Sequence, residues 1–180
     1  MELAERDGYD AVRLRDVAEQ AEVALGTVYR RYSCKEDILA SVLNRQVSML
    51  KQTVEDNPGT GATPEDRLGD FFEQITSVLA AAPKLAGAML RTVASGVPEL
   101  VERVSRYRGE MTSILLMVMR GGEETTTDLT AEQEEVLASV LQDVLFAALV
   151  GWTGGLHDTA HVVAHLNETT QLLFRGARSA

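Results

Sequence analysis

The residues best suited to chemistry form a run of cationic and hydroxyl side chains between positions 23 and 35. Arg30, Arg31 and Lys35 lie in this run, which has no acidic residue although the chain as a whole carries a net charge of −10. Thr27 and Tyr29 add two hydroxyl groups. Cations and hydroxyls are the donors that contact DNA phosphates. The run therefore predicts a nucleic-acid surface; the alternative is an ordinary solvated helix with half-buried tyrosines.

Two short helical patterns position this run. Leu14, Val17 and Ala18 recur at helical spacing, and a second pattern opens at Leu25 and continues to Tyr32. Between the patterns there is room only for a turn of about three or four residues, which is the spacing of a helix-turn-helix. In such a unit the first residues of the second helix reach base edges in the major groove of DNA.

Four sequence pieces around this unit match a known family. They are Gly8-Tyr9 and the segments Arg15 to Ala18, Val23 to Tyr29, and Lys35 to Leu39. Together they resemble the DNA-binding domain of the TetR family of bacterial transcriptional regulators. The resemblance implies a cytoplasmic, homodimeric repressor that binds a palindromic operator in double-stranded DNA. The expected DNA contacts are Arg13, Arg15, Leu25, Gly26, Thr27, Tyr29, Arg30, Arg31 and Lys35.

Three positions depart from the family pattern. Glu22 stands where the turn usually has glycine, and if that position needs a positive φ the change costs roughly 1 kcal/mol. Arg13 stands where a threonine often caps the second helix. Cys34 stands where Ser, Asn or Asp caps the fourth helix, and Ser33 is a candidate to replace that cap. We expect these departures to alter the DNA contacts more than the fold.

Length and composition predict an all-α protein with an amino-terminal head and a larger body. Apolar residues make up 45% of the 180 residues and there are four prolines. Residues 1–51 carry eight basic and nine acidic side chains, so most of the negative charge lies in the body. We predict a helix-turn-helix domain over residues 1–45 and a ligand-binding and dimerisation domain over residues 46–180. No secretory signal or membrane span is expected, because the longest apolar run, Val144 to Gly151, is short.

Apolar spacing and capping signals predict the helices of the body. They cover residues 35–55, 63–82, 85–94 and 98–120, and two long helices start near Thr130 and Asp158. Thr130 and Gln133 match a capping box, and the acidic, Thr-rich stretch before them predicts a loop. The last two helices are more apolar than one core needs. The family resemblance implies that they pair with a second copy; the alternative is that they close the core of one copy.

The family resemblance implies an effector in the body, and the adaptable and aromatic apolar residues spread over its helices would suit an apolar ligand; the alternative is that these residues fill the core. The candidates are Phe71, Phe72, Met89, Met111, Leu115, Met119 and Trp152. A looser resemblance, to actinobacterial repressors of sterol and lipid catabolism, implies a bulky apolar effector such as a lipid or an acyl-CoA. Its phosphates would need cations such as Arg91, Arg103, Arg106 or Arg108. The alternative function is a helical lipid-binding sensor that does not bind DNA by itself.

Other chemistry lacks its partners in the sequence. His157, His161 and His165 lie four residues apart and could chelate a metal, but only Asp158 is close enough in sequence to add a ligand, so a solvated or interface stripe is favoured. Cys34, at a helix start, could be an activated thiolate, but no histidine or second cysteine is near it. We expect no catalytic residue, no metal and no cofactor.

Overall fold

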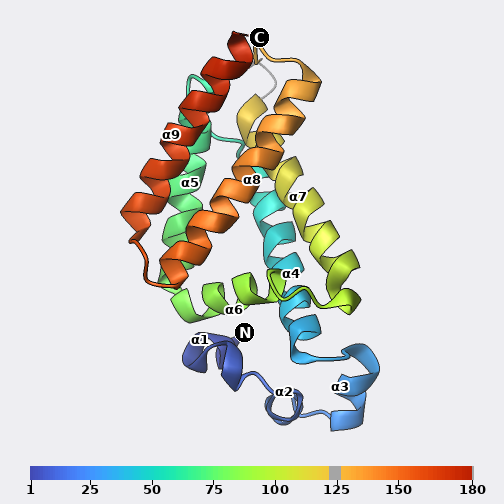
Figure 1. The fold of residues 1–180 in the computed structure, drawn as a ribbon. Helices are drawn as coiled ribbons and strands as arrows, with labels where there is room; N and C mark the ends of the chain where they lie inside the picture. Colours follow the sequence, from blue (N-terminus) through green and yellow to red (C-terminus); the bar gives the residue numbers. More distant parts are fainter. Residues whose placement is uncertain (122–126, 180) are drawn as a thin grey trace.

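The structure is a computed structural model that describes residues 1–121 and 127–179, in which helices are the only regular elements (Figure 1). The predicted all-α class is confirmed. A small head lies at one end of the molecule, and the long helices of the body extend away from it (Figure 1). The acidic loop predicted before Thr130 falls mainly at residues 122–126, outside the described residues.

The head consists of α1 (Glu2–Asp7), a 3₁₀ turn (Tyr9–Ala11), α2 (Leu14–Gln20) and α3 (Leu25–Arg31). α4 (Lys35–Asp56) begins in the head and runs into the body (Figure 1). The predicted domain boundary after residue 45 therefore falls inside α4. Tyr32, expected to continue the recognition helix, has extended backbone just after α3 ends.

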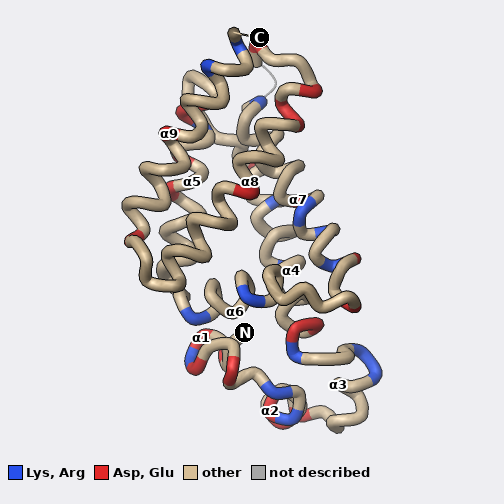
Figure 2. Tube along the Cα trace, in the orientation of Figure 1, with Lys and Arg blue, Asp and Glu red and all other residues tan. Residues whose placement is uncertain are grey.

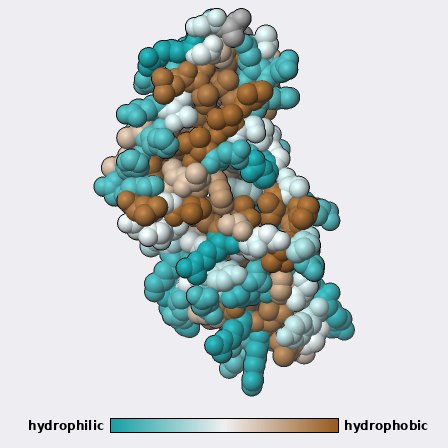
Figure 3. Space-filling view, viewed as in Figure 1, coloured by the Kyte–Doolittle hydropathy of each residue, from teal (hydrophilic) through white to brown (hydrophobic). Residues whose placement is uncertain are grey.

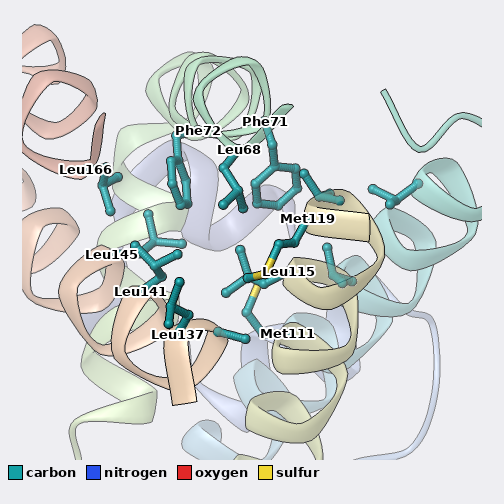
Figure 4. Packing of buried hydrophobic residues seen from close by; sticks show 14 of the residues in the cluster. Leu68, Phe71, Phe72, Met111, Leu115, Met119, Leu137, Leu141, Leu145 and Leu166 are labelled. Carbon is teal, nitrogen blue, oxygen red and sulfur yellow. The ribbon is translucent and has the colours of Figure 1, made fainter. Parts of the chain in front are cut away.

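The body consists of α5 (Pro64–Ala81), α6 (Pro83–Val93), a 3₁₀ turn (Pro98–Leu100), α7 (Val101–Arg120), α8 (Ala131–Thr153) and α9 (Thr159–Arg178). α9 packs against α5 and α8, α7 packs against α4 and α8, and α6 crosses the end that faces the head (Figure 1). The main core fills the space between these helices (Figure 4). Within it, Phe72 lies toward Leu166, whereas Phe71 lies toward Met119 (Figure 4).

Side-chain caps set where three body helices begin. The Thr63 hydroxyl accepts the N–H of Asp66 at 3.1 Å, and the Asp66 carboxylate accepts the N–H of Thr63 at 3.1 Å. Thr130 and Gln133 form the predicted capping box in the same way, with distances of 3.3 and 2.9 Å. Asp158 caps α9 through its carboxylate. Because these signals are local, the starts of the helices were predictable.

A buried arginine joins α5 to the end of α7. Arg67 is 2% exposed and donates from Nε to the carbonyl oxygen of Val118 at 3.1 Å and from Nη1 to that of Gly61 at 2.9 Å. Its Nη2 donates to the carbonyl of Met119. Val118 and Met119 lie in the last turn of α7, where carbonyls lack helical partners and the helix dipole is negative. The helix end thereby compensates the buried cation.

The longest apolar helix of the body is α8. By length and composition it could cross a membrane, but a core helix passes the same test, and α8 packs against α7 and α9. Its outward side chains Val136, Val140 and Val150 are exposed. Hydrophobic surface follows α8 and α9 in the space-filling view (Figure 3). The body therefore has an apolar outer face that one copy of the chain leaves open.

Candidate nucleic-acid interface and ligand cavity

A Schellman turn joins α2 to α3. The N–H of Val23 bonds to the carbonyl of Ala18 at 3.0 Å, and the N–H of Glu22 bonds to that of Glu19 at 3.1 Å. These two bonds define the motif, whose left-handed residue is usually glycine. Glu22 holds this conformation with φ 53°, and no other non-glycine residue described has a positive φ. The turn thus has the backbone of the family pattern without its glycine.

α3 exposes nearly its whole circumference. Val28 is buried and anchors the helix to the head, whereas the predicted contacts around it are exposed: Leu25, Gly26, Thr27, Tyr29, Arg30 and Arg31. Tyr29 is 58% exposed, so it is not a half-buried helix tyrosine. Arg30 donates from Nη2 to the hydroxyl of Thr27 at 3.0 Å. In Figure 2 the end of α3 is coloured blue, the colour of Lys and Arg. α3 therefore presents cationic and hydroxyl side chains to solvent.

The other predicted DNA contacts lie at the starts of α2 and α4. Arg13 and Arg15 are exposed, and Arg13 makes no side-chain cap on α2. The Lys35 side chain is 26% exposed, with Nζ 4.0 Å from the carboxylate of Asp10 and 3.9 Å from the ring centre of Tyr9. Lys35 is therefore already oriented by the head before any DNA is present.

Tyr9 contacts both Lys35 and Glu36 at the start of α4. Its hydroxyl donates a hydrogen bond to the carboxylate of Glu36 in the first turn of α4. Burial and then this bond raise the pKa of Tyr9 to about 12. The hydroxyl, which is protonated at neutral pH in any case, therefore remains a donor into the alkaline range.

The start of α4 lacks the side-chain cap common at such positions. Cys34 is its N-cap residue and makes no capping bond. Ser33 does not take over the cap; instead its N–H donates to the carboxylate of Asp37 at 3.0 Å. The same carboxylate pairs with Arg103 of α7 at 2.6 Å. The first turn of α4 is therefore held by a contact with the body.

A second ion pair joins head and body through α6. Arg91, near the end of α6, lies 3.5 Å from the carboxylate of Asp10 in the head. The sequence offers Arg91 and Arg103 as cations for the phosphates of an effector, whereas in the structure they pair with Asp10 and Asp37. No sequence signal could have found these pairs, because each partner is distant along the chain.

A cavity of about 450 Å³ lies between α4, α5, α6, α7 and α8. Of the predicted ligand residues, the lining includes Phe71, Met89 and Met111. Those outside the lining are Phe72, Leu115 and Met119, in the main core, and Trp152, partly buried against it. None of the four arginines predicted to bind an effector's phosphates lines the cavity. Arg106 lies 3.5 Å from the carboxylate of Glu102, and Arg108 lies 2.7 Å from that of Asp143.

α6 forms much of the wall between this cavity and the head, and Met1 and Glu5 of the head also line the cavity. Leu85 and Met89 line the cavity and also belong to a smaller core cluster with Ala4, Val12 and Leu39. Ala4 and Val12 belong to the head, and Leu39 lies in α4. A molecule in the cavity would touch side chains that also support the head, which gives the two regions a shared wall.

The histidines lie near the outer face of α8 and α9. His161 and His165 are exposed with ring centroids 6.0 Å apart, and a ring nitrogen of His157 is 2.8 Å from the carbonyl oxygen of Ala148. Leu172, also on α9, is 65% exposed. Within residues 1–121 and 127–179 no three His, Cys, Asp or Glu side chains are grouped to hold a metal ion.

Two protein-family models match most of the chain. The model described as "Bacterial regulatory proteins, tetR family" matches residues 1–42, which contain the head. The model described as "Tetracyclin repressor-like, C-terminal domain" matches residues 61–173, which contain most of the body. Between the two matches lie residues 43–60, which hold the rest of α4 and most of the loop that follows it.

Proteins similar in sequence to this chain include transcriptional repressors. The HTH-type transcriptional repressor KstR of Mycobacterium tuberculosis is 29% identical over 180 residues, covering 100% of this chain and 79% of the relative. KstR of Rhodococcus jostii is 30% identical over 171 residues, covering 95% of this chain and 77% of the relative. These relatives agree with the actinobacterial resemblance noted in the sequence.

Solved structures share the arrangement of helices. A TetR transcriptional regulator from a Rhodococcus species superposes with a TM-score of 0.82 at 19% identity, covering 96% of this chain and 89% of the other. The regulator FadR of Bacillus subtilis, solved in complex with stearoyl-CoA, has a TM-score of 0.65 at 23% identity, covering 97% and 94%. The exposed helix-turn-helix, the family models and the relatives agree, and the chain belongs to the TetR family of bacterial transcriptional regulators.

Proposed function

We propose that this protein is a cytoplasmic transcriptional repressor that binds an inverted-repeat operator as a homodimer and leaves it when a bulky apolar effector fills the cavity. The observation that carries the proposal is the shared wall: Leu85 and Met89 of α6 touch both the cavity and the residues that support the helix-turn-helix. The relatives named as repressors support the DNA-binding part. Catalysis has no part in this function.

α3 is the proposed recognition helix. Leu25, Gly26 and Thr27 form its first turn, the part of such a helix that reaches base edges. The phosphate contacts come from Arg13, Arg15, Tyr29, Arg30, Arg31 and Lys35. In a dimer the two recognition helices would be about 34 Å apart, or a multiple of that helical repeat. The operator is accordingly an inverted repeat.

The dimer forms through α8 and α9. Val136 and Val140 of α8 and Leu172 of α9 are exposed apolar residues on helices that otherwise pack in the core. Burying such side chains against a second copy is favourable at about 25 cal/mol per Å² of apolar surface. Exposed apolar faces of this kind mark interaction sites.

The effector occupies the cavity between α4 and α8. The cavity has a volume of about 450 Å³, which lies within the range of roughly 300–1,000 Å³ typical of small-molecule sites. FadR of Bacillus subtilis, which has the same fold, was solved with stearoyl-CoA. A lipid or the acyl part of an acyl-CoA fits these conditions. By moving Leu85 and Met89 it would shift the head away from its DNA-binding position.

A selection of bound genomic DNA fragments at about physiological salt tests this function. We expect enrichment of one inverted repeat, and candidate lipids can then be screened for release of that DNA. Failure to enrich any sequence would contradict DNA binding and favour the lipid-binding sensor. Enrichment that no apolar ligand reverses would contradict only the effector part.

A further inference from the structure

We propose that Tyr107 selects the ligand of the cavity, and that this ligand is an uncharged apolar molecule whose carbonyl oxygen accepts a hydrogen bond from the tyrosine hydroxyl. The inference rests on the proposed function, because it assigns a chemical class to the effector of the same cavity. It follows from the polar groups of the lining.

The lining offers an ionised ligand no counter-charge. Its walls include buried apolar side chains such as Val47, Leu145 and Leu149. The described lining contains no Lys or Arg, and its carboxylate, Glu5, lies on the exposed side of α1. Burying an ionised group without a counter-charge is strongly unfavourable. The part of the ligand that enters the cavity is therefore uncharged.

Tyr107 is a hydrogen-bond donor without a protein acceptor. It lies on α7, lines the cavity and packs, partly buried, against the main core. No residue in the described ranges 1–121 and 127–179 forms a hydrogen bond with its hydroxyl. A tyrosine phenol is ordinarily protonated at neutral pH, and burial raises the pKa of Tyr107 further, so the hydroxyl stays a donor. Such a group requires an acceptor from a ligand or from water.

The other polar side chains of the lining are engaged or lie at its open edge. The amide of Gln46 donates to the sulfur of Met1 at 3.3 Å. The hydroxyl of Thr53 donates at 3.0 Å to a carbonyl one turn earlier in its own helix. Gln74 is exposed to solvent. Among the polar side chains of the lining that are not exposed, Tyr107 is thus the one that no described residue pairs, and it is the group proposed to orient a bound molecule.

A carbonyl ligand satisfies this hydroxyl, whereas a plain hydrocarbon leaves it unpaired. A hydrogen bond of this type contributes about 0.5–1.5 kcal/mol, which corresponds to roughly a 2- to 13-fold difference in affinity. Sites built around one polar group discriminate strongly against analogues that lack its partner. Without Tyr107 the cavity would select a ligand by size and apolarity alone. With Tyr107 it also selects for a hydrogen-bond acceptor.

The test uses three probes of similar size: butylbenzene, 1-phenylbutan-1-one, which adds a carbonyl, and 4-phenylbutanoate, which adds a carboxylate. Dissociation constants are measured by ligand-detected NMR titration on the intact protein, on Tyr107→Phe and on the control Tyr32→Phe, whose tyrosine lies in the head outside the cavity. Thermal unfolding confirms that each variant is folded. We expect the wild-type protein to bind the ketone at least 2-fold more tightly than the hydrocarbon, and to bind the carboxylate more weakly than the ketone.

Tyr107→Phe should remove the preference for the ketone and leave the affinity for butylbenzene unchanged, whereas Tyr32→Phe should change neither. Equal weakening of ketone and hydrocarbon, or no change in either, would overturn the role of Tyr107 and leave the proposed function intact. Tighter binding of the carboxylate would overturn the uncharged class. Binding of no probe by the wild-type protein would overturn both the inference and the cavity as effector site, while the DNA selection would still stand.

Discussion

Replacing Glu22 by glycine should stabilise the protein, because Glu22 holds a left-handed backbone with φ 53° at the end of α2. This conformation costs a residue with a side chain roughly 1–2 kcal/mol, whereas glycine adopts it freely. Glycine also makes the unfolded chain more flexible, which offsets about 0.4–1 kcal/mol. Taking the middle of each range, about 1.5 and about 0.7 kcal/mol, leaves a net gain in the free energy of unfolding of about 0.8 kcal/mol.

Thermal unfolding followed by circular dichroism measures this gain. For a chain of this length 1 kcal/mol shifts Tm by about 2–4 °C, so Glu22→Gly should raise Tm by roughly 1–4 °C. Glu22→Ala is the first control, because it removes the same carboxylate and keeps the strained backbone, and its Tm should not rise. Glu19→Gly is the second control: Glu19 lies inside α2, where glycine should lower stability by about 0.5–1 kcal/mol.

Two results would refute this reasoning. An equal rise for Glu22→Ala and Glu22→Gly would show that the carboxylate, and not the backbone, destabilises the turn. No rise for Glu22→Gly would show that the Schellman turn relaxes around the glutamate without strain. Either result would remove the main departure from the family pattern as a source of instability in the DNA-binding head.

Four further substitutions probe separate features. Arg67→Met removes three hydrogen bonds to backbone carbonyls, so we expect a loss of about 2–3 kcal/mol and a fall in Tm of roughly 5–10 °C; an unchanged Tm would mean that water replaces the guanidinium. Cys34→Ser supplies the missing cap of α4 and should add about 1 kcal/mol in a urea titration, and no gain would show that the first turn is already satisfied. Lys35→Ala should weaken DNA binding on every sequence and reduce the slope of log affinity against log salt by about one; an unchanged slope would place Lys35 away from the phosphates. Arg103→Ala unpairs Asp37 at the start of α4 and should reduce the effect of a bound effector on operator affinity by about 2- to 10-fold, measured by fluorescence anisotropy with and without effector; an effect equal to that of the wild-type protein would exclude this ion pair from the coupling.

Features with a local signal were predictable from the sequence. The capping box of Thr130 and Gln133 predicts the start of α8. The spacing between the apolar residues of α2 and those of α3 predicts the helix-turn-helix. Such signals depend on neighbours a few residues away. Even the unusual backbone of Glu22 could be expected, because the family pattern places a glycine there.

The ligand cavity could not be predicted, because its lining depends on the rotation of each helix. Phe71 and Phe72 are adjacent and equally apolar, yet Phe71 lines the cavity and Phe72 lies in the solid core. Tyr107 was missed because nothing in its neighbourhood distinguishes it from other partly buried aromatic residues. The links of Arg91 and Arg103 to the head were hidden for a related reason: their partners come from segments far away in the sequence.

The buried Arg67 has a consequence for how this protein can be engineered. The loop between α4 and α5 lies at the surface, and such loops usually tolerate insertions and fused tags. At Gly61, however, an added Cβ would lie 2.7 Å from the backbone nitrogen of Arg67 and 2.9 Å from its Cγ. The carbonyl of Gly61 also holds the guanidinium. A peptide inserted beside Gly61 would therefore disturb the end of α7 inside the body, and a label for spectroscopy should be attached elsewhere.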